Sequence, residues 1–241
     1  MKTLLVGAHP GHELRLHHWM EQSRPDVFFI TDGSGSAGVP RLQSSLAVIN
    51  RVGSRMLAGS GSLPDRRLYE AMRGRDIGLF QALKEQLAAL VRAGGYDELV
   101  CDGLEGFNTA HDWCHYLVQS VARPLRVSVL EHSLVNAPDA WAGPGRRILC
   151  LEDEALDRKL RAAAAYPEMA VEVEETLRRW GGGAFNVEVL RPAHWSERPP
   201  TPAGQPPYYE VFGEQRVREG AYPEVIRWES HLRPLVEGIW A

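Results

Sequence analysis

The chain has 241 residues, of which 44% are hydrophobic and 24% are charged, and its formal net charge is −4. These values are typical of a globular protein that can bury a core, and they exclude a disordered or fibrous chain. The acidic balance argues against nucleic acid as a partner, and no apolar run approaches the roughly 18 residues that a membrane span needs. The three cysteines, Cys101, Cys114 and Cys150, show no CxxC spacing, which favours reduced thiols in a cytoplasmic protein.

The first half of the chain alternates short apolar runs with helical patterns. We predict strands at 2–8, 26–31, 98–102 and 127–132, and helices at 12–22, 40–56, 74–93 and 111–122, the last with Thr109 as its N-cap. We interpret the first apolar run as a strand rather than a signal peptide, because histidines and an acid follow it at once.

The second half is expected to add strands at 146–152 and 186–190 and one long charged helix at 153–180. A proline-rich irregular connection follows at 192–207, and 208–241 is expected to be extended and turn segments before a short helix. Strands that alternate with helices predict an α/β fold, a Rossmann-like three-layer sandwich with a mainly parallel sheet. We treat 1–241 as one domain, with a core at 1–190 and a C-terminal extension at 191–241.

Polar residues gather where the predicted strands end. In parallel sheets, ligands bind outside the carboxyl ends of the strands, so these residues are expected to share one edge. They are His9 and His12 after the first strand, Asp32 after the second, Asp102, Glu105, His111, Asp112 and His115 after the third, and His132 after the fourth.

Two pairs of histidines have spacings that suit a metal ion. His9 and His12 lie three residues apart across Pro10, and imidazole is a good ligand for zinc and related divalent ions. His111 and His115 have the i, i+4 spacing that puts two rings on one face of a helix. Taken singly, each pair can also be explained structurally, the first as a turn and a helix cap and the second as surface polar residues. Four histidines exceed the three protein ligands of a usual catalytic zinc, so one of them is free to act as a general acid.

The sequence GAHPGHE (7–13) resembles the AHPDDE signature of LmbE/PIG-L-type metal-dependent N-deacetylases. A TDG turn at 31–33 and Arg41 add to the resemblance, which covers about residues 2–130. It implies a zinc-dependent hydrolase, with Zn²⁺ or another divalent metal, that removes an acyl group from the amide nitrogen of an N-acylated amino sugar or similar small molecule by metal-activated water. A homo-oligomer is compatible with it.

The family's roles carry over position by position. The resemblance implies that His9 is a metal ligand, that His12 replaces the aspartate ligand, and that His115 supplies the third ligand, with His111 as the neighbouring acid. The family's general base is an aspartate, and Gly11 stands in its place.

Two assignments remain open, the general base and the substrate-binding residues. Asp112 and Glu105 are the candidate substitutes, although Asp112 could equally be a first-turn acid that suits the helix dipole. Arg41 and Asp32 are the candidate substrate-binding residues, and Arg41 could instead be an exposed charge at a helix start.

Two other functions compete with the hydrolase. One is a degenerate relative that binds a ligand or catalyses a different reaction, which the loss of the base at Gly11 supports. The other is a dinucleotide-binding enzyme with Asp32 as the ribose partner, but its first turn should read GxGxxG rather than GAHPGH.

Overall fold

A computed structural model describes residues 1–135, 144–194 and 196–240 of the chain. Within these residues, seven strands form one sheet in the order β3-β2-β1-β4-β5-β7-β6. Strands β3, β2, β1, β4 and β5 pair in parallel, and β7 is antiparallel to both of its neighbours. The predicted α/β fold with a mainly parallel sheet is therefore confirmed. The strands are β1 (Thr3–Gly7), β2 (Asp26–Phe29), β3 (Arg55–Met56), β4 (Glu98–Asp102), β5 (Ser128–His132), β6 (Arg147–Cys150) and β7 (Val187–Pro192).

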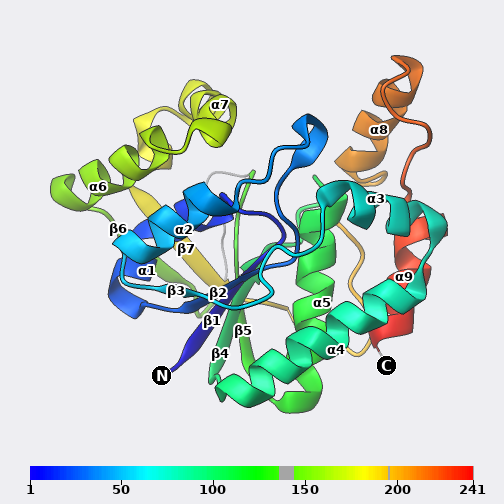
Figure 1. The fold of residues 1–241 in the computed structure, drawn as a ribbon, viewed down its shortest axis with the longest axis horizontal. Helices are drawn as coiled ribbons and strands as arrows, with labels where there is room; N and C mark the ends of the chain where they lie inside the picture. The colour runs from blue at the N-terminus through cyan, green and yellow to red at the C-terminus, as the bar shows by residue number, and fades with distance from the viewer. Residues whose placement is uncertain (136–143, 195, 241) are drawn as a thin grey trace.

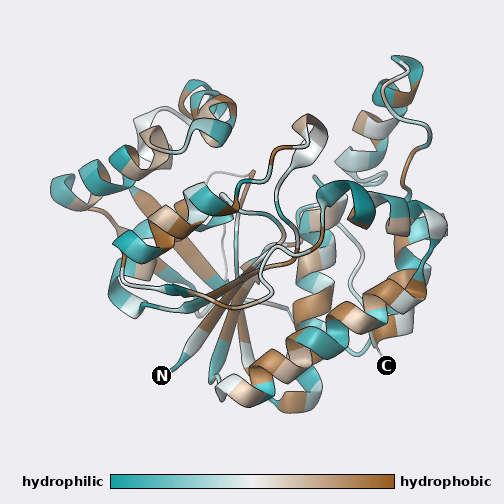
Figure 2. Ribbon diagram, in the orientation of Figure 1, coloured by the Kyte–Doolittle hydropathy of each residue, from teal (hydrophilic) through white to brown (hydrophobic). Residues whose placement is uncertain are grey.

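Helices cover both faces of this sheet, which gives the three layers (Figure 1). Alternate residues of β1 belong to different cores: Leu4 and Val6 pack with the helices of one face, and Leu5 packs with those of the other. The first face carries α4 (Ile77–Gly94), α5 (Thr109–Leu125) and α9 (Arg233–Trp240), and the second carries α1 (His17–Ser23), α2 (Leu42–Arg51) and α6 (Asp153–Ala164). The central strands are accordingly apolar along most of their length (Figure 2).

The start of α5 differs by one residue from the prediction. Asn108, rather than Thr109, is the N-cap, and its side chain accepts a hydrogen bond from the Ala110 N–H. The helix predicted at 40–56 was too long, because α2 ends at Arg51 and β3 occupies the last two predicted positions. The helix α3 (Asp65–Gly74) was not predicted at all. The loop after β4 leads into the first turn of α5. Residues of this loop and of this turn therefore lie at the same edge of the sheet.

The long helix predicted at 153–180 was wrong, because the chain breaks near Pro167. Helix α6 ends at Ala164, a 3₁₀ turn spans Pro167–Met169, and α7 runs from Ala170 to Trp180. Proline lacks an N–H donor and disfavours helical backbone in the residue before it, which accounts for the break.

The C-terminal segment was also predicted wrongly, since most of it is helical. Helix α8 (Tyr208–Arg218) follows the proline-rich connection, and a π-helical turn (Trp228–Leu232) leads into α9. Leu235, Val236 and Ile239 of α9 are buried in the same core as α4 and α5. The tail is therefore part of one layer of the sandwich.

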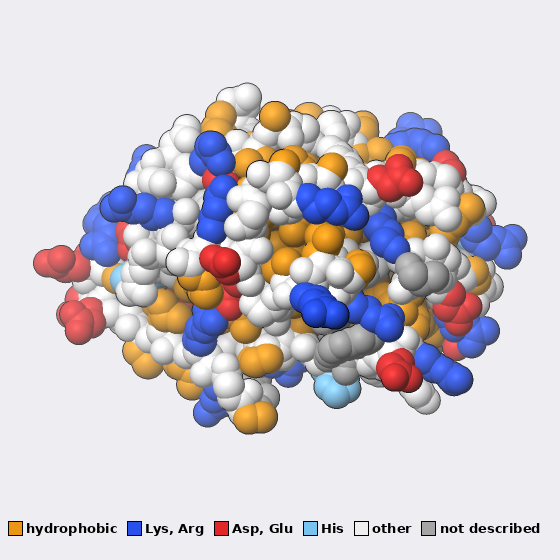
Figure 3. All heavy atoms as spheres, turned by 90° about the horizontal axis from the view of Figure 1, so that it is seen from below, with side chains coloured by type: hydrophobic (Ala, Val, Ile, Leu, Met, Phe, Trp, Pro, Cys, Tyr) orange, Lys and Arg blue, Asp and Glu red, His pale blue; other side chains and the backbone are white. Residues whose placement is uncertain are grey.

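The surface opposite the carboxyl ends of the strands carries basic, acidic and apolar side chains intermixed (Figure 3). No helix in the part of the chain that the structure describes is both long enough and apolar enough to cross a membrane.

Candidate active site

Three histidine rings meet at the carboxyl end of the sheet. His9 and His12 follow β1, and His111 lies in the first turn of α5. The ring centroids are 5.4 Å apart for His9 and His12, 5.4 Å for His9 and His111, and 4.5 Å for His12 and His111. All three line one cavity. The two histidine segments are far apart in the sequence and converge in the fold, as the sequence suggests. His111 is the residue of the second segment that meets His9 and His12.

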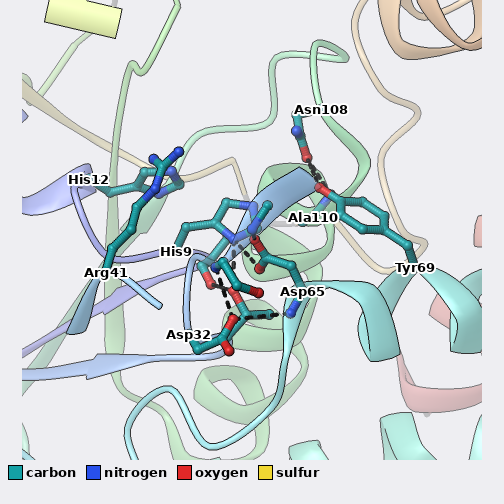
Figure 4. A network of polar contacts seen from close by, with 12 residues as sticks. His9, His12, Asp32, Arg41, Asp65, Tyr69, Asn108 and Ala110 are labelled. Carbon is teal, nitrogen blue, oxygen red and sulfur yellow. Dashed lines mark hydrogen bonds and ion pairs between the residues drawn. The ribbon is translucent and has the colours of Figure 1, made fainter. Parts of the chain in front are cut away.

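A carboxylate holds the Nδ1 atom of two of these rings. His9 Nδ1 is 2.9 Å from Asp65 Oδ1 and 2.7 Å from the Thr31 hydroxyl. Figure 4 shows His9 and Asp65 pointing toward each other. His12 Nδ1 is 2.9 Å from Asp102 Oδ2. In metal proteins, such carboxylates fix the tautomer and orientation of a ligating ring and leave the Nε2 atom for the metal.

Burial disfavours the charged form of two of these rings, His12 and His111. Burial, together with the charge of His9, holds the pKa of His12 well below its usual value, and burial does the same for His111. Burial would raise the pKa of Asp65, but its hydrogen bonds with His9 and Thr31 outweigh burial and hold the pKa well below its usual range. The uncharged imidazoles of His12 and His111 and the ionised carboxylate of Asp65 are in the protonation states that metal binding requires.

The donor set suits a zinc-like ion. A Zn–N bond of about 2.1 Å places each ring centre about 3 Å from the ion, so three such rings lie about 5 Å apart, close to the separations observed. The Nδ1 atom of His111 is buried and has no hydrogen-bond partner in the described chain. The rings meet edge to face, and within the described ranges no three such side chains are already arranged as a metal site. The chemistry of the donors fits, and coordination would require small ring rotations.

The cavity around the histidines has a volume of about 400 Å³. One part of its wall is polar and includes Asp65, Tyr69 and Asn108, with the Tyr69 hydroxyl 3.4 Å from Asn108 Oδ1 (Figure 4). The rest of the wall is largely apolar, and it comes from the 3₁₀ turn after β1, the start of the loop that follows β5, and the α7 region. These apolar residues are Leu14, Leu134, Val135, Met169, Val173, Trp180 and Phe185.

His115, expected as the third ligand, does not join the other histidines. Its Nδ1 atom lies 3.0 Å from Glu131 Oε2, and it does not line the cavity. The i, i+4 spacing puts His115 one turn further along α5, where it faces the strand β5 that carries Glu131. The structure brings His111, rather than His115, to His9 and His12.

Glu105 and Asp112, the expected substitute bases, both hold loops. Glu105 accepts hydrogen bonds from Ser133 Oγ and from the N–H groups of Leu134 and Val135. Asp112 Oδ1 accepts the N–H groups of Glu105 and residue 106, each at 3.1 Å. Burial raises the pKa of Asp112 to about 8. Neither side chain lines the cavity, so the geometry gives them a structural role instead of contact with a substrate.

The two expected substrate-binding residues differ in position. Arg41 lines the cavity and contacts Met169 Sδ at 2.9 Å and Glu172 at 3.2 Å. Figure 4 shows its guanidinium beside His12. Asp32 is not part of the cavity wall, because its Oδ1 accepts the N–H groups of Ser34 and Asp65. It orders the turn that presents Asp65 to His9.

Gly11 occupies a position that would not accept a larger side chain. Its φ angle is 109°, and a Cβ atom built there would lie 2.6 Å from Met169 Sδ. Its N–H donates to Glu13, whose pKa burial raises to about 7. The place where the resembling family has its general base is therefore filled by a thioether.

Sequence reasoning missed the roles of Asp65 and Asp102. Asp102 was placed on the correct edge but given no function, although ligating histidines usually have a carboxylate behind them, and β4 neighbours β1. Asp65 follows β3, which has two residues and too little pattern to be recognised.

The fold is similar to those of solved deacetylases. The A40926 pseudoaglycone deacetylase Dbv21 matches with a TM-score of 0.59 and 14% identity, over 79% of this chain and 96% of that one. A deacetylase triple mutant from the teicoplanin biosynthetic pathway matches with a TM-score of 0.59 and 10% identity, over 81% and 100%. The conserved protein TT1542 from Thermus thermophilus matches with a TM-score of 0.52 and 16% identity, over 80% and 93%.

No family model matches the sequence, and none of the curated proteins matches it. At these identities the similarity concerns the fold. The fold expected from the altered AHPDDE motif is therefore confirmed: this chain has the architecture of the antibiotic deacetylases.

Proposed function

We propose that the protein is a metal-dependent hydrolase that removes an acyl group from the amide nitrogen of a small molecule, such as an N-acylated amino sugar. The main support is the convergence of three imidazole rings on a cavity of ligand size, at the sheet edge where α/β folds bind ligands. Similarity in fold to enzymes described as deacetylases favours this reaction over dinucleotide chemistry.

His9, His12 and His111 would hold the metal ion. A divalent ion bound there supplies a Lewis acid for the acyl oxygen and lowers the pKa of water. Asp65 and Asp102 orient His9 and His12, and so they act as positioning residues. In the reaction, the oxygen of water joins the acyl carbon, the C–N bond breaks, and the amine nitrogen takes a proton.

The polar part of the cavity wall suits the amine carrier. Asn108, Tyr69 and Arg41 present amide, hydroxyl and guanidinium groups that can hydrogen-bond to the hydroxyl groups of a sugar. The cavity and its surroundings thus offer both reaction and recognition groups for a polar N-acyl compound.

Metal analysis and a substrate panel test this function together. We expect protein purified without chelator and incubated with Zn²⁺ to hold about one ion per chain, and to release amine from at least one N-acylglucosamine. Exchange of His111 for alanine should remove both properties, whereas exchange of His231, which contacts Glu224 away from the cavity, should leave both intact. Protein without metal and without amine release would contradict the proposal.

A second function, binding without hydrolysis, rests on a specific observation. Gly11 cannot supply a base, and the acids that line the cavity already have partners in the described chain: Asp65 with His9, Glu172 with Arg41, and Glu175 with Arg178. Metal uptake and ligand affinity with no amine release from any acyl compound would favour this alternative.

A further inference from the structure

Helix α7 presents an apolar stripe to the cavity, flanked by Glu172, Glu175 and Arg179, which also line it. Met169, Val173, Thr176 and Trp180 line the cavity and are spaced by four, three and four residues, which places them along one side of a helix. None of the α7 residues is buried, and Trp180 is 43% exposed. An amphipathic helix normally buries its apolar stripe against a core. Here Met169 and Val173 pack against a hydrophobic cluster and remain only partly buried, and Trp180 is exposed.

The opposite wall of the same region is also apolar. Leu14 and Phe185 are buried members of a hydrophobic cluster to which Met169 and Val173 also belong. All four of these residues line the cavity beside the histidines. This part of the cavity wall is therefore continuous with one of the protein's own apolar clusters. An apolar group that binds here is transferred from water to an apolar surface.

The cavity is larger than an acetyl group needs, and it also has to hold part of the amine carrier. A cavity of about 150 Å³ lined by apolar side chains takes benzene, and the cavity here has about 400 Å³. An acetyl group has two carbon atoms and would leave the α7 stripe uncovered.

The polar and apolar parts of the wall lie on different sides of the histidines. Asp65 and Tyr69 belong to α3, and the apolar stripe belongs to α7, and Figure 1 shows these helices at opposite sides of the carboxyl edge of the sheet. Met169 and Val173 offer a sugar hydroxyl no hydrogen-bond partner, whereas Asp65 and Tyr69 do, and an unpaired buried hydroxyl is costly. The amine carrier thus belongs toward α3 and the acyl group toward α7.

We propose that the substrate carries a medium-length aliphatic acyl group, and that Met169, Val173, Trp180, Leu14 and Phe185 form its binding site. This inference rests on the proposed function for the position of the amide. Each methylene that becomes fully buried contributes about 0.8 kcal/mol, or about fourfold in affinity. Chain length should therefore control binding strongly.

Calorimetry with metal-free protein tests the site without requiring catalysis. The probes are N-acetyl-, N-butanoyl-, N-hexanoyl- and N-octanoylglucosamine. We expect the octanoyl compound to bind at least about 100-fold more tightly than the acetyl compound, well below the roughly 4000-fold that full burial of six methylenes would give. Equal affinity for all four compounds would overturn the inference.

Helix α7 offers a matched pair of variants. Val173→Asp places a carboxylate in the apolar stripe, whereas Val171→Asp places the same group two residues away, where the side chain is 75% exposed and outside the cavity. We expect Val173→Asp to reduce the gain from acetyl to octanoyl to less than about tenfold and Val171→Asp to retain it. Thr176→Asp provides a second substitution in the stripe if Val173→Asp does not fold. A gain that survives both stripe variants would overturn the inference.

The outcomes separate this inference from the proposed function. Zinc-loaded protein that releases amine with no preference for chain length would contradict the acyl site only. Binding that strengthens with chain length, with no amine release from any compound, would contradict the hydrolase only.

Discussion

Two histidine–carboxylate pairs lie near the carboxyl edge of the sheet, and only one of them faces the cavity. In the cavity-side pair, His12 Nδ1 is 2.9 Å from Asp102. In the core-side pair, His115 Nδ1 is 3.0 Å from Glu131. Both pairs are buried, and both histidines follow a predicted motif, so distance and burial alone do not distinguish them.

The remaining partners of each carboxylate make the difference. Glu131 also pairs with Arg191 at 2.7 Å, so the carboxylate of the core-side pair has a cation as a second partner. Asp102 instead accepts the N–H of Ala8 at 2.8 Å, and His12 has two other imidazoles as neighbours. An imidazole whose carboxylate also has a cation stabilises structure, whereas one held beside other imidazoles at a cavity is suited to bind a metal.

Exchange of the two histidines should separate the pairs most strongly. We expect His12→Ala to lose bound zinc and to lower kcat/KM by at least about 1000-fold, because a ligand is removed. His115→Ala should keep the metal and most of the activity. Metal analysis and amine release measure both effects, and equal loss of zinc in the two variants would show that the pairs do not differ.

Exchange of Glu131 should act on stability. Glu131→Gln breaks a buried ionic pair and is expected to lower the free energy of unfolding by about 3 kcal/mol, with zinc affinity unchanged. Denaturant unfolding measures the first quantity and metal titration the second. A variant with full stability but weakened zinc binding would place Glu131 in the metal site.

The stability that Glu131 contributes should depend on pH with a definite sign. Burial would raise its pKa, but His115 and Arg191 outweigh burial and lower it. A carboxyl with a lowered folded pKa stabilises above its unfolded pKa of about 4.3 and loses that contribution as pH falls through the folded value. The stability difference between wild type and Glu131→Gln should therefore be constant above about pH 5 and shrink below about pH 4.

Asp102→Asn should weaken the metal site more mildly. The amide can still accept the N–H of Ala8 but no longer provides an anion behind His12. Loss of such an outer carboxylate typically costs about 10–100-fold in metal affinity or activity. We expect a zinc dissociation constant raised by about that factor, measured by competition with a chelator, and an unchanged constant would remove Asp102 from its positioning role.

Much of the layered fold could be predicted from local sequence patterns. The roles of the site residues could not, because they depend on contacts between segments that are distant in the sequence. The buried runs at 98–102 and 127–132 predicted their strands because parallel strands are apolar on both faces. Helical spacing also put His111 and His115 on one helix face. It did not show that the second of them meets Glu131, because that carboxylate comes from a strand that pairs only in the folded sheet.

Two further misses have physical causes. The charged pattern at 153–180 is continuous in sequence, but one proline divides it into α6 and α7, and that division creates the cavity wall. The sequence shows that Gly11 stands in the place of the aspartate base, but it does not show why. The reason lies in Met169, which is 158 positions away and reaches the same space.

The smallest expected effect concerns the contact between Gly11 and Met169. This contact leaves no room for an aspartate at position 11, beside the cavity-side pair. Gly11→Ala adds a Cβ atom at a φ of 109° and 2.6 Å from Met169 Sδ, and we expect it to cost about 2 kcal/mol of stability, of which the backbone conformation contributes about 1 kcal/mol. Gly220→Ala is the matched control for the backbone part, because Gly220 also has a positive φ of 71° but open space around it.

A double-mutant cycle with Met169→Ala isolates the side-chain part. If the thioether fills the place of the missing base, Gly11→Ala should cost less in the Met169→Ala background, approaching the cost measured at Gly220. In the Met169→Ala background the side chain of Gly11→Asp can be accommodated as well. A rise in kcat for amine release by this double variant would mean that the site lacks only a general base. An identical cost of Gly11→Ala in both backgrounds would mean that backbone conformation alone selects the glycine.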